Sequence, residues 1–272
     1  LLQRDESVRV LQALAKMDLR ALQGAVTRVN RRGEVMLTLC GTAKEPPIRS
    51  FPGVQSLYYC RLNPHPAHAL DGDCRLLSGA ERLEEELFDL RFALLPQSFF
   101  QVNAKQAERM YAVALDALEL QNGQAVLDAY CGAGTITLLL AARGARATGV
   151  EIVPPAVADA RASARHNGLE HAARFLLGDA AREIPRLIAE GETFDAAVLD
   201  PPRRGADARL LEALVKAAPR RIAYISCDPG TLARDLKILK AGGYCLNFAQ
   251  PVDMFAYTGH VETVVLMSRV KK

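Results

Sequence analysis

From Gln124 onward, short apolar runs alternate with helical stretches, and this rhythm restricts the fold more than any other feature of the chain. Helical segments lie between most of these runs, which is typical of a parallel sheet covered by helices on both faces. We therefore predict a doubly wound α/β sheet. Little helix separates the last two runs, so we expect the sheet to end in an antiparallel pair. The predicted strands are 125–129, 145–150, 173–177, 196–199, 221–227, 244–249 and 261–267.

The first third of the chain has a different pattern. Short alternating runs at 24–30, 34–40, 55–61 and 88–94 are separated by glycine and proline, which favours antiparallel β structure. We expect an α/β fold with a smaller N-terminal antiparallel β domain. The expected parts are an N-terminal segment with helical spacing (1–20), a small central β domain (21–95) and the main α/β domain with a bridging helix (96–272).

Composition sets only broad limits. The 272 residues are 50% hydrophobic and the formal net charge is +3, which permits a nucleic-acid partner without indicating one. The six cysteines form no C-x-x-C pair, so no metal site is predicted. No signal peptide or membrane-spanning run is recognisable, and we expect a cytoplasmic monomer with no membrane partner. The chain begins with Leu1 instead of methionine, and we therefore expect a fragment that lacks a preceding domain.

A glycine turn and two acidic residues indicate a cofactor. An apolar strand runs into Gly132-Ala133-Gly134 and then into a helix, and the glycines let the backbone approach a ligand. The further glycine of the dinucleotide fingerprint is absent. Glu151 ends the second strand, where a carboxylate accepts from ribose hydroxyls, and Asp179 follows the third strand, where it accepts from an adenine amine. The glycine turn and the two acids together favour S-adenosylmethionine over NAD. The structural alternatives are a solvated charge for Glu151 and a turn or helix N-cap for Asp179.

Two further strand ends carry residues suited to catalysis. Asp200-Pro201-Pro202-Arg203 follows the fourth strand, so Asp200 is expected at the carboxyl edge with Arg203 beside it. Cys227 ends the fifth strand. Asp228 and Pro229 then suit an N-cap and a first helical turn, and a helix start favours a cysteine thiolate. A small buried hydrophobe is the alternative for this cysteine.

Glu262 begins the last apolar run, where a charge costs free energy unless it is satisfied. A half-buried carboxylate with a raised pKa suits proton abstraction, and a solvated strand-entry residue is the alternative. A thiolate, a base and a methyl donor together suit methylation of uracil C5. The thiolate adds at C6, C5 attacks the methyl group, and the base removes the C5 proton before the thiolate leaves.

Residues from about 85 to 272 resemble the RNA uracil-5 methyltransferases that modify 23S rRNA and the T-loop of tRNA. The resemblance rests on Ser98-Phe99-Phe100-Gln101-Val102-Asn103, Asp128-Ala129-Tyr130-Cys131-Gly132-Ala133-Gly134, Leu199-Asp200-Pro201-Pro202-Arg203, Ser226-Cys227-Asp228-Pro229 and His260-Val261-Glu262-Thr263. It implies a class I S-adenosylmethionine-dependent methyltransferase acting on uridine C5, with 23S rRNA expected first and tRNA second.

The resemblance also implies a role for each matching residue. Cys227 is the expected nucleophile and Glu262 the expected base. Phe100 and Arg203 are expected to contact the target base. The expected contacts of S-adenosylmethionine are Gln101, Tyr130, Gly132, Glu151, Asp179 and Asp200.

The chain departs from the family in two ways. Many members carry an N-terminal β-barrel that binds RNA and four cysteines that hold an iron–sulfur cluster, and neither is visible here. The chain is then either a truncated piece or a member of a shortened lineage. The alternative functions are a cytosine-5 methyltransferase, a non-catalytic RNA-binding module that keeps the donor pocket and, more distantly, a dehydrogenase.

Overall fold

The protein is described by a computed structural model that covers residues 4–270. The chain divides into two compact units, Leu1–Ser98 and Phe99–Lys272. Each unit has its own core, and each is described by itself. Within the described residues, every helix is too short or too polar to cross a membrane.

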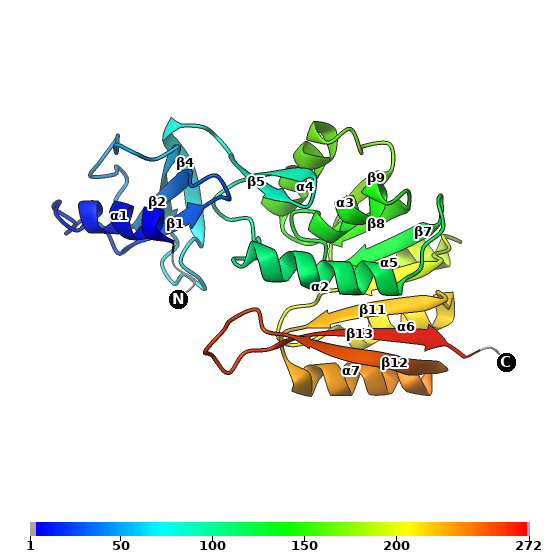
Figure 1. Ribbon diagram of the computed structural model, residues 1–272. Coiled ribbons are helices and arrows are strands. Elements are labelled where there is room, and N and C mark those ends of the chain that lie inside the picture. The colour runs from blue at the N-terminus through cyan, green and yellow to red at the C-terminus, as the bar shows by residue number, and fades with distance from the viewer. Residues whose placement is uncertain (1–3, 271–272) are drawn as a thin grey trace. The chain divides into compact units, whose positions relative to one another are not determined.

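The N-terminal unit contains a four-stranded sheet in the order β1-β2-β3-β4 and a separate two-stranded hairpin (Figure 1). Its pairs run antiparallel except β2 and β3, which are parallel, because the connection over 42–55 brings the chain back to the end at which β2 began. Its elements are α1 (Asp5–Leu14), β1 (Gly24–Val29), β2 (Val35–Gly41), β3 (Ser56–Leu62), β4 (Gly72–Gly79), β5 (Leu83–Leu87) and β6 (Leu90–Leu94).

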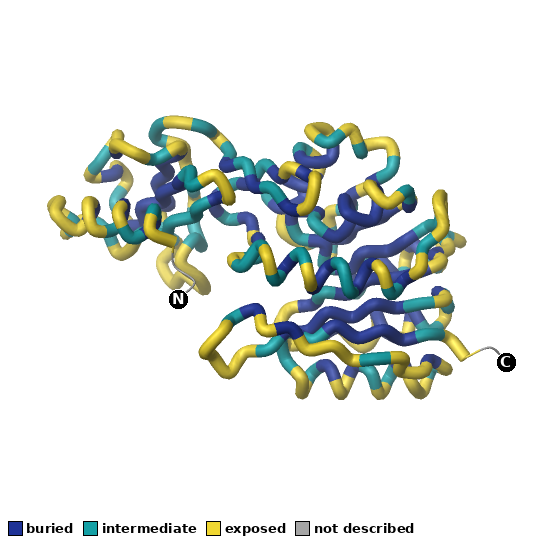
Figure 2. The backbone as a smooth tube through the Cα atoms, in the orientation of Figure 1, coloured by how far each residue is buried: buried dark blue, intermediate teal, exposed yellow. Residues whose placement is uncertain are grey.

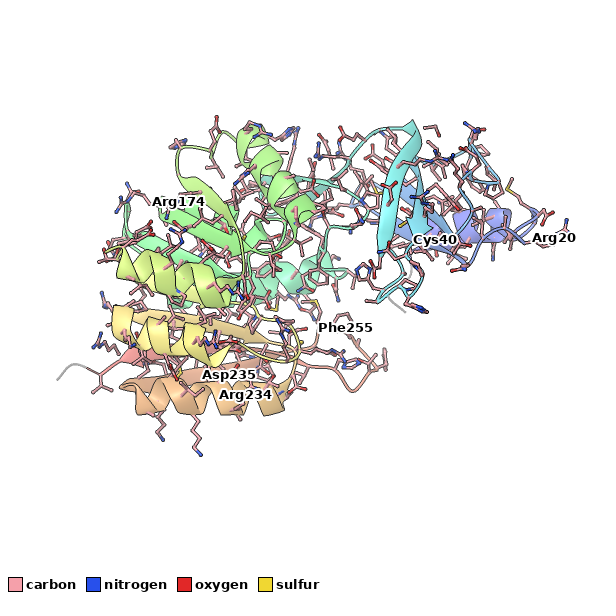
Figure 3. The ribbon with its side chains drawn as sticks, turned by 180° about the vertical axis from the view of Figure 1, so that it is seen from behind. Arg20, Cys40, Arg174, Arg234, Asp235 and Phe255 are labelled. Atoms are coloured by element: carbon pink, nitrogen blue, oxygen red, sulfur yellow. The ribbon has the colours of Figure 1, made fainter. Side chains whose placement is uncertain are left out.

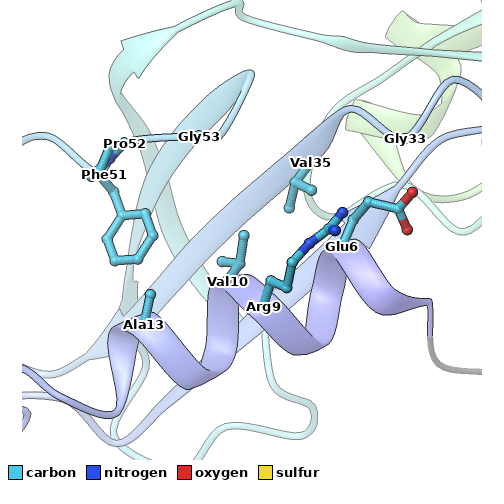
Figure 4. Close-up of a pocket in the computed structure, with 9 residues that line it drawn as sticks. All are labelled: Glu6, Arg9, Val10, Ala13, Gly33, Val35, Phe51, Pro52 and Gly53. Atoms are coloured by element: carbon cyan, nitrogen blue, oxygen red, sulfur yellow. The ribbon is translucent and has the colours of Figure 1, made fainter.

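The core of this unit forms where α1 lies on the sheet. Val10 and Leu14 of the helix belong to one core cluster of buried residues with Leu37, Leu39 and Tyr59 of the strands. A pocket lies beside this contact (Figure 4), and it includes none of the site residues expected from the sequence. Its lining is Glu6, Arg9, Val10, Ala13, Gly33, Val35, Phe51, Pro52 and Gly53.

The C-terminal unit is a seven-stranded sheet in the order β12-β13-β11-β10-β7-β8-β9. The pairs β11–β13 and β12–β13 are antiparallel and the other four pairs are parallel, which confirms the predicted sheet and its antiparallel end. The strands are β7 (Ala125–Ala129), β8 (Arg146–Glu151), β9 (Ala173–Leu177), β10 (Ala196–Leu199), β11 (Arg221–Ser226), β12 (Tyr244–Val252) and β13 (Glu262–Arg269).

Helices cover both faces of this sheet (Figure 1). The helices are α2 (Ala104–Ala117), α3 (Thr135–Ala142), α4 (Pro154–His166), α5 (Ala180–Ala189), α6 (Ala208–Ala217) and α7 (Pro229–Ala241). Leu127 and Ala129 of β7 belong to a core cluster with residues of α5, α6 and α7. Asp128 points to the opposite face, since it accepts a hydrogen bond from Thr137 of α3. The central strands are therefore buried on both sides (Figure 2).

The parallel strands end together at one edge of the sheet. Ala129 is level with Val150 of β8 and with Leu199 of β10, and Leu199 is level with Tyr224 of β11. The residues at or just beyond these ends therefore share one edge, and Asp128, Glu151, Asp179 and Asp200 all lie at it. Open α/β sheets bind their ligands at this carboxyl edge.

Candidate functional site

The register of the antiparallel end brings Cys227 and Glu262 together. Ser226, the last residue of β11, is paired with Thr263 of β13. Because the two strands run in opposite directions, the residue that follows Ser226, just beyond the end of β11, lies across from the residue that precedes Thr263 in β13. Those residues are Cys227 and Glu262. The ladder thus places the expected nucleophile and the expected base opposite each other at the carboxyl edge.

The helix after Cys227 begins as its residues dictate. Asp228 is the N-cap of α7 and accepts a hydrogen bond from the backbone N–H of Thr231 at 2.8 Å, and Pro229 occupies the first turn. Ser226 Oγ donates to the carbonyl of Asp228 at 2.9 Å. These bonds hold the turn that carries Cys227.

The free site does not favour the Cys227 thiolate. Burial raises the pKa of the half-buried Cys227 thiol, and the charges of Glu262 and Asp200 raise it further. A backbone hydrogen bond and the guanidinium of Arg203 act in the opposite direction but do not reverse the shift. The pKa of Cys227 in the free protein is therefore shifted opposite to the direction expected from a helix start, because burial and two neighbouring carboxyl groups disfavour the thiolate.

The two carboxyl groups beside this thiol hold their protons more strongly than in water. Burial raises the pKa of Asp200 to about 8, with added repulsion from Glu262 and Asp128. The pKa of Glu262, which is buried, is also raised by burial, and Arg203 opposes that rise. Carboxyl groups with raised pKa values suit acid–base work near neutral pH.

The glycine turn after β7 is fastened to the end of β8. Glu151 accepts hydrogen bonds from the backbone N–H groups of Gly132, at 3.0 Å, and of Val153, at 2.8 Å. A Cβ at Gly132 would meet nothing within 4 Å, so the space beside this residue is open. A Cβ at Gly134 would lie 2.8 Å from Ala160 and from the ring of Phe175. A positive φ of 83° and close packing against α4 and β9, and not the approach of a ligand, therefore explain Gly134.

Asp128 is the second buried acid of this edge. The side chain is fully buried, and its Oδ2 accepts from Thr137 Oγ1 at 2.6 Å. Its Oδ1 has no hydrogen-bond partner among residues 4–270. Burial raises the pKa of Asp128 to about 7. An unpartnered buried oxygen is costly, and this one marks a position that a donor group of a ligand could satisfy.

Tyr111 was not expected from the sequence. This buried residue of α2 forms a side-chain hydrogen bond with Gln101. Its pKa is raised well above the usual tyrosine value, first by burial and then by the charge of Asp200, with smaller contributions from Asp128 and Glu262. Tyr111 therefore faces the acidic side chains of the site. Its position in an ordinary amphipathic helix offered no signal in the sequence.

Two of the expected cofactor residues also have structural roles. Tyr130 has a positive φ of 68°, which is rare for a residue with a side chain, and its hydroxyl accepts from the backbone N–H of Asp207 at 3.3 Å. Asp179 is the N-cap of α5 and accepts from the N–H of Ala181 at 3.0 Å. Both lie at the carboxyl edge, and their contacts with a cofactor remain predictions.

The expected contacts with the target base differ in exposure. Phe100 is 8% exposed, whereas its neighbour Phe99 is 70% exposed. Arg203 is exposed, and its guanidinium donates to Nδ1 of His260 at 3.3 Å. The His260 ring in turn makes an edge contact with Phe255. A loop before β13 is thereby joined to the loop after β10.

Comparison with known proteins matches this architecture. A family model described as tRNA (Uracil-5-)-methyltransferase matches residues 80–270. A Bacillus cereus protein called an uncharacterized RNA methyltransferase is 42% identical over 250 residues, which are 88% of this chain and 54% of that protein. A similar protein of Halalkalibacterium halodurans is 39% identical over 257 residues, which are 90% of this chain and 56% of that protein. The chain thus spans about half the length of these curated relatives.

A solved structure has a similar fold. The Pyrococcus abyssi tRNA (uracil-54, C5)-methyltransferase, in complex with S-adenosyl-L-homocysteine, is 29% identical with a TM-score of 0.79. The match covers 97% of this chain and 65% of that one. In this chain, no group of three histidine, cysteine or acidic residues within 4–270 is arranged to hold a metal ion. Because the family model matches well over half of the residues, the chain belongs to the tRNA (uracil-5-)-methyltransferase family.

Proposed function

We propose that this chain carries the catalytic part of an enzyme that methylates C5 of a uridine in RNA through a covalent bond between Cys227 and C6. The observation that carries the proposal is that Cys227 and Glu262 lie opposite each other, because Ser226 is paired with Thr263. A nucleophile and a base in one place are what a covalent addition followed by proton removal needs.

The carboxyl edge also suits S-adenosylmethionine, the proposed methyl donor. Asp128 offers a buried oxygen without a partner, and the space beside Gly132 is open. The Pyrococcus abyssi relative holds S-adenosyl-L-homocysteine, the demethylated donor. When bound, the donor supplies a methyl group on a positively charged sulfur. The residues proposed to hold it are Gln101, Tyr130, Gly132, Glu151, Asp179 and Asp200.

The residues of the chain divide the proposed reaction between them. The Cys227 sulfur, as thiolate, forms a bond to C6 of the uracil, and the electrons of the C5–C6 double bond move toward the O4 carbonyl. C5 thereby becomes nucleophilic and gains the methyl group. Glu262 then takes the proton from C5, the double bond re-forms, and the bond between sulfur and C6 breaks. Arg203 and Phe100 are proposed to orient the uracil.

The RNA that carries the uridine is a separate question. We keep 23S rRNA as the first proposed substrate, in line with the family resemblance. The named activity of the Pyrococcus abyssi relative favours tRNA as the second. Mapping of 5-methyluridine in total RNA, with and without the full-length protein, separates the two.

Replacement of Glu151 tests the donor site. The Glu151→Ala variant should bind S-adenosylmethionine about 1.5–3 kcal/mol more weakly, the range for hydrogen bonds to a charged group. Calorimetry on the folded variant measures this loss, with circular dichroism to check folding. The exposed acid Glu170 provides the matched control, since Glu170→Ala should leave the affinity unchanged. Equal affinity in Glu151→Ala and in the unaltered protein would remove Glu151 from the donor site.

The raised pKa values of Asp128, about 7, and of Asp200, about 8, predict how donor binding depends on pH. A positively charged donor favours the ionised carboxylates, so its binding should lower both pKa values and release protons. Affinity should therefore rise from about pH 6 to about pH 8 and then level off above the free-protein pKa values. S-adenosylhomocysteine lacks the charged sulfur and should show a clearly weaker rise. Identical pH profiles for the two ligands would contradict the placement of the donor beside these acids.

Variants of the two catalytic residues should fail at different steps. The Cys227→Ala variant should form neither 5-methyluridine nor a covalent RNA adduct, because no bond to C6 can form. In Glu262→Gln the bond can form but the C5 proton cannot leave, so methylated RNA should remain attached to Cys227. A denaturing gel detects this as a slowly migrating species. Normal turnover by a folded Glu262→Gln protein would exclude Glu262 as the base.

The neighbouring phenylalanines provide a matched pair. The target uridine must leave its stack to reach Cys227, so Phe100→Ala should lower methylation of a loop RNA more than it lowers donor binding. Phe99→Ala removes the more exposed ring and should have the smaller effect on turnover. Rates and donor affinities are measured for both variants. A larger loss of turnover in Phe99→Ala would transfer the stacking role to Phe99.

A further inference from the structure

A set of bonds from α7 holds the loop that carries Arg203. Asp235 of α7 is fully buried, and its Oδ2 accepts from the backbone N–H of Ala206 at 2.7 Å and from the hydroxyl of Tyr224 at 2.6 Å. Arg234 donates to Asp235 Oδ1 at 2.8 Å. Figure 3 labels both residues on α7. A buried carboxylate is stable only when its oxygens are bonded in this way, and one of its partners is the loop backbone.

Two more residues of α7 bind the same loop. The guanidinium of Arg234 donates to the carbonyl of Arg204 at 2.9 Å, and the hydroxyl of Thr231 donates to the carbonyl of Arg203 at 3.1 Å. Thr231, Arg234 and Asp235 are spaced three and four residues apart and therefore lie on one face of α7. We call these three residues the α7 clamp.

Gly205 shows how closely the clamp approaches the loop. Its φ is +79°, and a Cβ there would meet Asp235 Oδ2 at 2.6 Å as well as the guanidinium of Arg234. The clamp therefore bonds to the backbone of Arg203, Arg204 and Ala206 and packs on Gly205. The loop backbone is held along its length, and this fixes the point from which the side chain of Arg203 extends.

The held loop lies beside the reacting thiol. Among the charges that face Cys227, Glu262 from β13 and Asp200 at the end of β10 oppose the thiolate, while Arg203 from the loop favours it. Arg203 also acts on Glu262. The helix that carries the clamp starts at Asp228, directly after Cys227. One helix thus fastens both the turn of the nucleophile and the loop of the neighbouring cation.

We propose that the α7 clamp, with Asp235 at its centre, is a positioning device that holds Arg203 beside Cys227 and Glu262. The clamp acts through Arg203 and touches no reacting atom. The proposal rests on the proposed function of Cys227 as nucleophile. Its test, however, reads the state of the thiol directly and needs neither RNA nor methyl transfer, so the two can fail separately.

The test is the pH dependence of alkylation at Cys227. Iodoacetamide reacts with the thiolate, and mass spectrometry of the Cys227 peptide gives the rate at each pH. Asp235→Asn and Arg203→Ala should each slow alkylation near neutral pH about three- to tenfold and move the profile to higher pH, because a cation near the thiolate is displaced or lost. Alkylation of the exposed Cys245 in the same digest is the internal reference.

The double variant distinguishes a positioning role from a packing role. If the clamp acts through Arg203, then Asp235→Asn combined with Arg203→Ala should slow alkylation no more than Arg203→Ala alone. A clamp that only stabilises the fold would lower the melting temperature and leave the Cys227 profile unchanged. An unchanged profile in folded Asp235→Asn protein would overturn the proposal.

A second pair of variants tests the proposal independently if the Asp235→Asn protein does not fold. Arg234→Ala and Thr231→Val each remove a bond to the loop carbonyls and keep the buried carboxylate with its Tyr224 and Ala206 partners. Both together should shift the Cys227 profile in the same direction as Arg203→Ala. If the folded double variant keeps the unaltered profile, the clamp does not position Arg203.

Discussion

The antiparallel ladder between β11 and β13 is the constraint on which the site depends. β13 runs against the parallel strands, so its first residues lie at the edge where β11 ends. Cys227 and Glu262, far apart in the chain, become neighbours for that reason alone. A shift of one residue in this pairing would turn Glu262 to the other face of the sheet. The buried side chains of β13, such as Val264 and Val265, oppose any such slip because they belong to the core.

The ladder also completes a group of acids that the fold holds out of water. Asp128, Asp200 and Glu262 come from three different strand ends, and burial raises the pKa of each. Withdrawing carboxyl groups from water near one another opposes folding, and the charge of Arg203 acts against the rise in the pKa of Glu262. On the proposed function, the charged sulfur of the methyl donor is the missing positive charge. The uncompensated acids of the free site would then favour binding of the positively charged donor over its uncharged-sulfur product.

Sequence patterns predicted elements well where burial imposes a period and poorly where it does not. The apolar runs of β7, β9 and β10 were placed to the residue. The pattern does not predict β4, in which no residue is buried. It does not predict β5 either, because the buried position between Leu83 and Leu87 is the charged Glu85, so burial alternates where the apolar pattern does not. The parallel pairing of β2 with β3 was also missed, because the direction of a strand depends on the path of its connection and leaves no local pattern.

The sequence by itself determined which residues carry reactive groups and that most of them follow strands, because turn chemistry and capping are local: Asp228 and Pro229 start α7 as predicted. Only the tertiary structure decided which strand ends meet. It brought Tyr111 toward the acids, raised the pKa of Cys227 where a helix start alone would lower it, and placed the α7 clamp on the loop of Arg203. Burial and register are properties of the whole sheet, and they act on residues that look ordinary in the chain.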